Sequence, residues 1–535
     1  MSRSAGTILH ISSLPSPYGI GTMGAQAYAF ADFLKKAGLK YWQVLPLVPA
    51  GSGNSPYSSY STTAGNPDLI DLEFLCRVGL LEKADVEACS WGENPKRVDF
   101  DAIHLNKLPL LEKAWARMKM LGRAEEVIPE EPAAEEVTEE KSPAKKKAAK
   151  AKPAEPTVPA PMLSLTEMEL FRLRSAGWVE DYALYMAIKE ANDDKAWYEW
   201  PADIAAREPQ AMAHWSKTAR DRVNFWVFVQ YLFYTQWEAL KAYANEGGVE
   251  IIGDIPIYVF HDSVDVWSNK KYFWMNKDYS LAKVAGVPPD AFSELGQRWG
   301  NPLYRWDVLE DEGYSWWIQR IRHNAAVYDW VRIDHFRGFD QFYAINADEE
   351  DARNGEWCEG PGYALFAEIE KQLGKVKILA EDLGVITPSV YKLLKATGFP
   401  GMKVLQFACS DPGNAYLPHN CGENSFMYTG THDNDTVPGW LTGGDPAEIA
   451  FAKKYFGISR IDTGHWDVIR GAFASNCMVA MTQMQDFLGL GSEDRMNVPA
   501  TPSGNWGFRM PKGRTTDALA EKIHDLLYCF GRLEG

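Results

Sequence analysis

The stretch Val331–Phe339, "VRIDHFRGF", begins as a buried β-strand and ends in a cluster of charges. Its apolar half runs directly into Asp334, His335 and a second arginine. Burying Asp334 or Arg332 without a partner would cost several kcal/mol, so charges at a strand end require partners from elsewhere in the chain. The stretch therefore predicts a strand whose far end serves a purpose beyond packing.

Seven further runs share this form: a short, β-rich apolar segment that ends in polar residues and leads into a loop or helix. Helical patterns lie between several of them, at Tyr363–Leu373 and Pro388–Thr397. Continuous apolar strands that alternate with helices are typical of a parallel sheet, and eight of them predict an α/β fold of the (β/α)8 TIM-barrel class. The eight predicted strands are Thr7–Ile11, Tyr41–Leu47, Val249–Tyr258, Trp330–Phe336, Val376–Asp382, Met402–Phe407, Ser425–His432 and Met478–Met484.

The connections between the predicted strands are unequal in length. About 200 residues separate the second and third strands and about 70 separate the third and fourth, whereas ordinary crossovers are far shorter. We therefore expect one catalytic barrel over residues 1–535, an inserted subdomain at about 52–248 and a lid subdomain at about 259–328. Insertions on βα loops lie over the active-site face of such a barrel. We expect no separate C-terminal β domain.

Residues 123–161 have a composition unlike that of the rest of the chain. The segment has no aromatic residue, and an acidic block up to Glu140 is followed by a basic block around Lys145, Lys146 and Lys147. Such a stretch cannot bury enough apolar surface to offset its ordering entropy. We therefore predict a disordered, charged insertion that acts as a solvated tether.

The composition argues against several classes of function. A formal net charge of −17 argues against nucleic-acid binding, which depends on clustered Lys and Arg. The first residues show no signal-peptide pattern, and no apolar run approaches the roughly 20 residues of a membrane span. The seven cysteines are scattered and form no CxxC motif, which favours reduced thiols. The sequence therefore predicts a cytoplasmic protein with neither a nucleic-acid nor a membrane partner.

Charged side chains gather at the predicted ends of four strands, where a barrel of this class places its catalytic groups. Together they indicate a convergent acidic site. One chemistry for such a site is divalent-metal binding, because two histidines stand next to aspartates; the other is glycosidic-bond chemistry, which needs one carboxylate as nucleophile and one carboxylic acid as proton donor. The residue types favour the second and leave the first open. The side chains are Asp254, Arg332, Asp334, Glu381, Asp382, His432 and Asp433.

Short words around these carboxylates resemble the signature blocks of the α-amylase clan of retaining glycosidases: "RIDHFRG" at 332–338, "AEDLG" at 380–384 and "THDND" at 431–435. Longer words resemble the amylomaltase, or 4-α-glucanotransferase, family, which is glycoside hydrolase family 77. The resemblance extends over nearly the whole chain outside the charged insertion. The longer words are "SLPSPYGIGTMG" at 13–24, "VLPLVPAGSGNSPYSSYSTTAGNP" at 44–67, "VAGVPPDAFSELGQRWGNPLY" at 284–304 and "LGLGSEDRMNVP" at 488–499.

The resemblance implies a role for each of three carboxylates. Asp334 would be the nucleophile that forms a β-glucosyl-enzyme intermediate, Glu381 the general acid and then base, and Asp433 the stabiliser of the oxocarbenium-like transition state. Arg332 stands two residues before Asp334, on the same strand face, where it can keep that carboxylate ionised and oriented. The substrate-binding residues that the resemblance implies are Ser55, Tyr57, Asp254, Asp290, Gln297, Trp299, Arg332, His335 and His432.

The resemblance also implies the reaction, which is transfer of α-1,4-glucan segments between maltooligosaccharides or longer glucans that serve as donor and acceptor. It implies no cofactor, no metal and no obligate protein partner. Transfer requires that the acceptor be held in place while water is excluded, and the loop at 284–304 is the expected lid. A hydrolase of α-1,4-glucans on the same fold is the alternative, since the carboxylates alone do not separate the two reactions.

Overall fold

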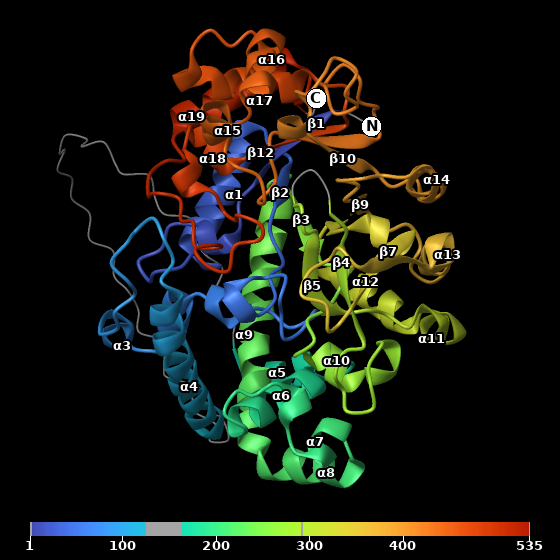
Figure 1. Ribbon diagram of the computed structural model, residues 1–535. Helices are drawn as coiled ribbons and strands as arrows, with labels where there is room; N and C mark the ends of the chain where they lie inside the picture. Colours follow the sequence, from blue (N-terminus) through green and yellow to red (C-terminus); the bar gives the residue numbers. More distant parts are fainter. Residues whose placement is uncertain (1–2, 125–162, 290–292, 534–535) are drawn as a thin grey trace, which may run out of the picture.

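Eight parallel strands form the centre of the molecule in the computed structural model of the chain, which describes residues 3–124, 163–289 and 293–533. They are β1 (Ser4–Ile8), β2 (Tyr41–Gln43), β3 (Glu250–Ile255), β6 (Trp330–Ile333), β9 (Ile378–Ala380), β10 (Gly401–Val404), β11 (Ser425–Tyr428) and β12 (Val479–Gln483). Hydrogen bonds join them in the order β10-β11-β12-β1-β2-β3-β6-β9. The N–H of Ala380 donates to the carbonyl oxygen of Pro400 at 3.0 Å, which brings the two outer strands together. The predicted (β/α)8 TIM barrel is confirmed (Figure 1).

Every strand ends earlier than the sequence predicts, because the last residues of each predicted run lie in a loop or a short helix. At the end of β6, for example, His335 has a left-handed backbone conformation with φ of 50°, so the chain turns away from the strand there. Asp334 and Glu381 consequently lie one residue beyond β6 and β9, at the carboxyl-terminal mouth of the barrel.

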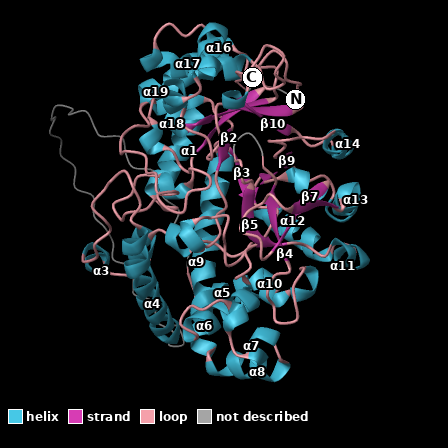
Figure 2. Cartoon of the chain, viewed as in Figure 1, coloured by secondary structure: helices cyan, strands magenta, loops and turns pink. Residues whose placement is uncertain are grey.

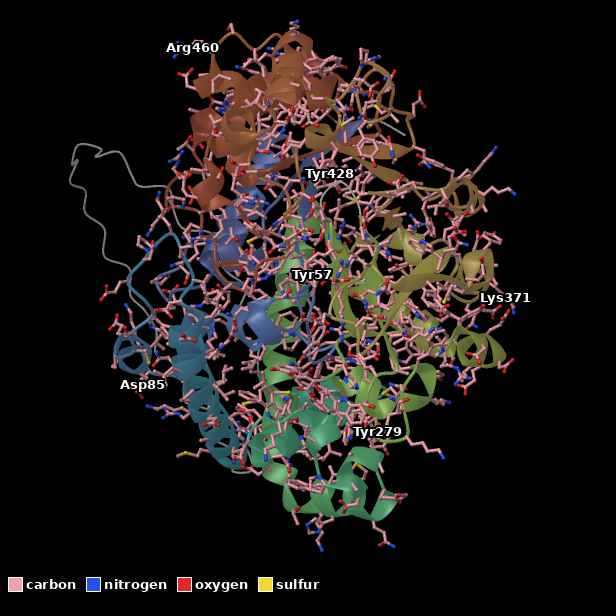
Figure 3. The ribbon with its side chains drawn as sticks, in the orientation of Figure 1. Tyr57, Asp85, Tyr279, Lys371, Tyr428 and Arg460 are labelled. Atoms are coloured by element: carbon pink, nitrogen blue, oxygen red, sulfur yellow. The ribbon has the colours of Figure 1, made fainter. Side chains whose placement is uncertain are left out.

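The inside of the barrel is a packed core to which all eight strands contribute. Tyr428, drawn inside the molecule in Figure 3, is one of these side chains, whereas Arg460 and Lys371 lie at the periphery. Because the interior is filled, functional groups are left to the mouth of the barrel. The buried core residues are Ile8, Tyr41, Ile252, Trp330, Leu379, Met402, Val404, Phe426, Tyr428, Val479 and Met481.

Helices surround the barrel (Figure 2). The predicted helices at 363–373 and 388–397 are confirmed as α13 (Gly362–Leu373) and α14 (Pro388–Thr397). After β12, the described residues 484–533 form helices, loops and no strand. No helix in the described ranges is both long and apolar enough to cross a membrane. The other helices of this layer are α1 (Ala25–Ala37), α9 (Arg220–Glu246), α12 (Ser315–Val327), α15 (Val437–Gly443), α16 (Pro446–Phe456), α17 (Gly464–Ala474), α18 (Met484–Leu488) and α19 (Asp517–Cys529).

A helical insertion separates β2 from β3. The long helix α9 packs on β3 and α1 and also against the inserted helices, which explains why every residue from 225 to 234 is buried. The predicted charged insertion lies almost wholly outside the described residues; its first two residues, Arg123 and Ala124, complete α4. The inserted helices are α2 (Leu72–Arg77), α3 (Lys83–Glu87), α4 (Phe100–Ala124), α5 (Leu165–Arg174), α6 (Val179–Ala191), α7 (Ala202–Ala206) and α8 (Pro209–Thr218).

A second, antiparallel sheet is present that the sequence patterns do not predict. Its strands β4 (Lys283–Val287), β5 (Gln297–Pro302), β7 (Gln341–Asn346) and β8 (Gly355–Glu359) are joined in the order β5-β4-β7-β8. Two of these strands come from the connection between β3 and β6, together with the short helices α10 (Val264–Ser268) and α11 (Trp306–Asp311), and two follow β6. The expected lid segment is therefore paired with the chain that follows Asp334.

Candidate active site

A cavity of about 680 Å³ opens at the mouth of the barrel. It collects side chains from the loops after β6, β9 and β11 and from β5. The sequence-predicted residues that line it are Gln297, Trp299, Arg332, Asp334, His335, Glu381 and Asp433.

Arg332 lies between two carboxylates. Its Nη1 donates to Oδ2 of Asp254 at 2.5 Å and its Nη2 donates to Oδ1 of Asp334 at 2.8 Å. Burial opposes the charge of Arg332, but Asp254 and Asp334 hold the pKa of its guanidinium well above the ordinary value. The charges at the end of "VRID" thus have a partner from elsewhere in the chain. This partner is Asp254, which stands opposite Arg332 in the register of β3 and β6.

Asp334 keeps one carboxylate oxygen available. Its side chain is 31% exposed, and Oδ1 is held by Arg332. Within the described part of the chain, no donor reaches Oδ2. Asp334 is therefore oriented through one oxygen and free to react through the other.

Glu381 lies beside Asp334 in a different environment. Its Oε2 accepts a hydrogen bond from the N–H of His335 at 2.7 Å, and its Oε1 accepts one from the N–H of Leu383 at 2.6 Å. Burial, and next the negative charge of Asp334, raise the pKa of Glu381 to about 8, although Arg332 and the two backbone bonds act in the opposite direction. Glu381 therefore holds a proton at neutral pH.

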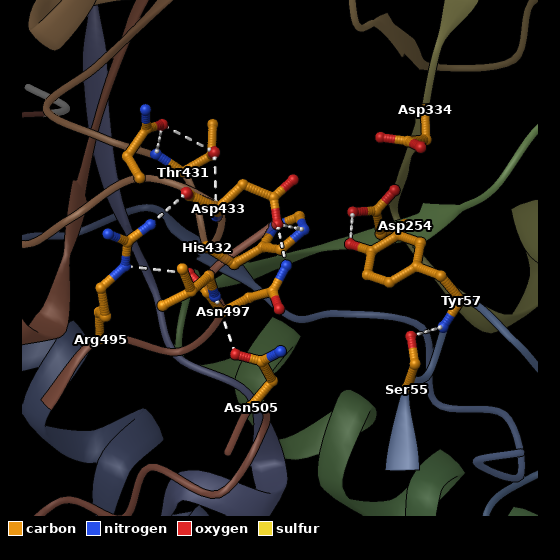
Figure 4. Close-up of polar contacts among 12 residues, drawn as sticks. Ser55, Tyr57, Asp254, Asp334, Thr431, His432, Asp433, Arg495, Asn497 and Asn505 are labelled. Atoms are coloured by element: carbon orange, nitrogen blue, oxygen red, sulfur yellow. Dashed lines mark hydrogen bonds and ion pairs between the residues drawn. The ribbon is translucent and has the colours of Figure 1, made fainter. Parts of the chain in front are cut away.

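Asp433 lies on the loop after β11 and is held from the C-terminal part of the chain (Figure 4). Its Oδ1 accepts a hydrogen bond from Nδ2 of Asn497 at 2.6 Å and lies 3.3 Å from Nε2 of His432. Nη2 of Arg495 donates to its main-chain oxygen at 2.8 Å. Since its side chain is 44% exposed, Asp433 is positioned by these partners while it faces the cavity.

The predicted residues Ser55, Tyr57, Asp254 and His432 do not line this cavity. The Tyr57 hydroxyl donates to Oδ2 of Asp254 at 2.8 Å, and its ring stacks on His432 with centroids 5.1 Å apart. Ser55 Oγ accepts a hydrogen bond from the N–H of Tyr57 at 3.2 Å. Tyr57 and Asp254 line a smaller, separate cavity, as His432 does with His10. These four residues therefore form a layer of aromatic and polar contacts around Asp433 and Arg332.

Trp299 and Gln297 lie on β5, and both line the cavity beside His335. The Trp299 indole meets the ring of His335 edge-on, with centroids 4.9 Å apart, and its Nε1 donates to Oε1 of Gln297 at 3.1 Å. Burial lowers the pKa of His335 to about 4, so its imidazole is neutral at physiological pH. Asp290, the remaining predicted residue, lies outside the described residues.

The cavity and supporting residues that the sequence patterns miss include Asn497 and Arg495, which hold Asp433, and Arg337 and Trp357. The Arg337 guanidinium lies 3.8 Å from the ring centroid of Trp357 and donates to the carbonyl oxygen of Val385. Asn497 and Arg495 stand in the word at 488–499, but nothing in that word indicates the partner. Trp357 lies on β8, a strand without an apolar run.

The open alternative of a metal site depends on grouped ligands. Across the described ranges, no three or more His, Cys, Asp or Glu side chains are grouped so that they could hold a metal ion. The two histidines that suggested such a site instead contact aromatic rings, His335 that of Trp299 and His432 that of Tyr57.

Comparisons with known proteins agree on one family. The model of the family described as 4-alpha-glucanotransferase matches residues 9–131 and 119–515. A 4-alpha-glucanotransferase of Clostridium butyricum is 42% identical over 529 residues, which cover 98% of this chain and 100% of that protein. One of Thermus thermophilus is 43% identical over 539 residues, with 99% of each chain covered. The structure of an amylomaltase from Streptococcus agalactiae in complex with acarbose is similar with a TM-score of 0.89 and 37% identity, covering 99% of this chain and 100% of that one.

The barrel, with carboxylates brought together at its carboxyl-terminal mouth, defines the class: a (β/α)8-barrel enzyme. Within that class, the chain belongs to the 4-alpha-glucanotransferase family.

Proposed function

We propose that this protein is a retaining 4-α-glucanotransferase that moves α-1,4-glucan segments from a donor to the 4-OH of an acceptor glucose or maltooligosaccharide. The observation that carries the proposal is the pairing of two unlike carboxyl groups. Asp334 is bound to a guanidinium and keeps a free oxygen, whereas Glu381 is buried with a pKa of about 8. Retaining glycosidic chemistry needs one ionised and one protonated carboxyl group of this kind.

In the first half of the proposed reaction, Oδ2 of Asp334 attacks the anomeric carbon of the donor. Glu381 gives its proton to the glycosidic oxygen, so the bond between that oxygen and the anomeric carbon breaks and the leaving glucan departs with a hydroxyl group. Asp433 stabilises the positive charge that develops on the sugar, through sugar hydroxyls. The product of this step is a covalent glucosyl-enzyme on Asp334.

In the second half, Glu381 is a carboxylate and takes the proton of the acceptor 4-OH. The acceptor oxygen attacks the anomeric carbon, and the bond between that carbon and Asp334 breaks. Both carboxyl groups return to their starting states. Arg332 donates a hydrogen bond to Asp334 and so stabilises this carboxylate as it leaves. Inversion at each step gives overall retention.

Transfer in place of hydrolysis requires that an acceptor be held while water is kept out. We assign this role to the segment between β3 and β6, at about 259–328, whose β5 carries Gln297 and Trp299 into the cavity. His335 and His432, with Ser55, Tyr57, Asp254 and Asp290, are proposed to bind sugar hydroxyls or to position the groups that do. The helices at about 52–248 are proposed as a subdomain on the same face.

The proposal is tested by incubating the purified protein with maltotriose, without added metal, and resolving the products while total reducing ends are counted. A ladder of longer oligomers with glucose released and constant reducing ends is expected. Asp334→Ala should lose turnover by at least about 10⁴-fold with an unchanged melting temperature. Rising reducing ends without longer products would assign the rival function, an α-1,4-glucan hydrolase.

The metal-dependent alternative is separated by the same assay. Turnover that survives EDTA at full rate is expected. Loss with EDTA and recovery with a divalent cation would contradict the two-carboxylate mechanism.

A further inference from the structure

A second cavity, of about 660 Å³, lies away from the catalytic mouth and has nearly the same size as the catalytic cavity. Its lining residues come mainly from α12, from α10 in the connection between β3 and β6, and from the ends of α5 and α6 in the helical insertion. These four helices are labelled in Figure 1. None of its lining residues lines the catalytic cavity. Its size is that of pockets which take ligands of a few rings, and junctions between subdomains are common places for them.

Two tryptophans give this cavity rigid aromatic walls. Trp178, directly before α6, packs against Phe171 and His323, with ring centroids 6.3 and 5.7 Å apart. Trp316, in the first turn of α12, packs against Phe273 and Tyr304 at 6.2 and 5.7 Å. Within the described part of the chain, neither indole N–H has a hydrogen-bond acceptor. Each ring is thus fixed by its neighbours and half-buried, with a free donor, which suits an apolar sugar face bordered by hydroxyl groups.

Polar side chains with unused hydrogen-bond donors also line this cavity. Nη1 of Arg322 donates to Oε1 of Gln319 at 2.7 Å, which fixes both side chains on α12 and leaves the amide of Gln319 and the rest of the guanidinium free to donate. Both side chains are exposed. The cavity therefore presents fixed hydrogen-bond donors next to aromatic surface.

The lining carries charges of both signs, with Arg174, Arg320 and Arg322 against Asp181 and Asp265. Arg320 is committed to the carbonyl oxygens of Pro256 and Ile257. Asp181 is likewise paired with Arg207, and Asp265 accepts hydrogen bonds from Thr62. The two remaining arginines, Arg174 and Arg322, can donate to the hydroxyl groups of a neutral ligand.

We propose that this cavity is a second glucan-binding site, in which a segment of neutral α-1,4-glucan stacks on Trp178 and Trp316 and accepts hydrogen bonds from Gln319 and Arg322. The inference rests on the proposed function, because it takes the substrate class from there. A glucan long enough to occupy both cavities is held at the enzyme between turnovers, whereas a short donor uses the catalytic cavity alone. The site therefore favours long glucans through KM.

The test compares amylose with maltotriose as donor. The double variant Gln319→Ala/Arg322→Ala, which changes only exposed side chains, should raise KM for amylose about fivefold to tenfold and leave KM and kcat for maltotriose unchanged. Trp178→Ala should do the same if its melting temperature is retained. Tyr528→Ala is the matched control, because this exposed aromatic residue lies outside both cavities. An unchanged KM for amylose in the double variant would overturn the inference.

A binding measurement separates this inference from the proposed function. Calorimetric titration of the Asp334→Ala protein with maltoheptaose should show two binding sites. When Gln319→Ala and Arg322→Ala are combined with Asp334→Ala in one protein, the titration should show one site. A single binding site in the protein that carries Asp334→Ala alone would overturn the inference, even if the wild-type protein catalyses transfer. If maltotriose is not turned over at all, two sites would still support the cavity while the proposed function fails. If the second cavity binds inorganic phosphate and does not bind maltoheptaose, it is an anion site and the inference is overturned.

Discussion

At the scale of single residues, the site is built by giving two neighbouring carboxyl groups different surroundings. Asp334 is bonded to the Arg332 guanidinium and partly exposed, whereas burial and the charge of Asp334 raise the pKa of Glu381 to about 8. The charge on Asp334 thus helps to keep the proton on Glu381. The free oxygen of one group and the proton of the other are the two things that the proposed reaction consumes first.

The pH dependence of turnover follows from Glu381. Its protonated form is the one required in the first step, so kcat/KM for maltotriose should fall as the pH rises through about 8. The decline lies on the alkaline side because the working form is lost on deprotonation. Initial rates measured from pH 5 to pH 10 check this. Glu381→Gln should be inactive at every pH, and a wild-type profile that stays flat above pH 9 would refute the assignment.

The ion pair of Arg332 with the buried Asp254 is predicted to make a large contribution to the free energy of unfolding. Arg332→Ala would leave Asp254, a side chain with 0% exposure, buried without its cation, which should lower the free energy of unfolding by about 3–5 kcal/mol. Urea denaturation followed by circular dichroism measures the change. Arg460→Ala is the matched control, because the pair of Arg460 with Asp462 is exposed at the surface and its loss should leave the urea midpoint unchanged. Equal midpoints for both variants would show that Asp254 does not depend on Arg332.

At the scale of elements, the antiparallel sheet connects the proposed lid to the chain that follows β6 and Asp334. β5 holds Gln297 and Trp299, β4 lies between β5 and β7, and β7 follows the turn after Asp334. The position of β4 and β5 is therefore fixed relative to Asp334, the proposed nucleophile, through backbone hydrogen bonds. A lid anchored in this way can hold an acceptor at a defined place, which is what transfer requires.

Gly286 in β4 is the place to disturb this arrangement. An added Cβ there would lie 2.2 Å from the carbonyl oxygen of Gln297 and 2.5 Å from Cδ1 of Ile345, so Gly286→Ala should displace β5. A shift of about 1 Å in the lid should lower the transfer rate by about tenfold to a hundredfold while hydrolysis falls less. The ratio of longer oligomers to new reducing ends measures this. Gly443→Ala, where no atom lies within 4 Å, is the control, and an unchanged ratio in Gly286→Ala would argue against the lid role.

The same elements show how far sequence alone can predict the fold and the site. The eight barrel strands are predictable because both faces of each strand are buried, so each has a continuous apolar run in the sequence. β5 is not, because of its six residues only Pro302 is buried. Likewise Glu381 and Asp334 are predictable at strand ends. Asn497 is 64 residues from Asp433 and lies in a loop, so no local pattern connects the two.

At the scale of the whole molecule, distant parts of the chain close a single barrel. Arg532, which is 1% exposed, donates to the carbonyl oxygens of Ser4, Phe473 and Cys477, so the C-terminal end is bonded to the first strand (Figure 1). The inserted helices pack on this barrel through α9. The catalytic cavity and the second cavity thus belong to one framework, with the helical insertion forming one wall of the second.

The charged stretch within that insertion is predicted to be dispensable for both stability and turnover. Its two flanks lie close together, because a Cβ added to Gly122 in α4 would lie 2.3 Å from Cδ1 of Leu165 in α5. A linker of about six Gly and Ser residues, which reaches roughly 20 Å, can therefore replace residues 125–162 without pulling on either helix. The melting temperature should change by no more than about 2 °C and turnover of maltotriose and amylose by less than about twofold. A variant in which residues 125–162 are scrambled at constant composition is the control for length and charge. A large loss of stability or turnover in the deletion, but not in the scrambled variant, would show that the segment acts through its length or charge and is more than a tether.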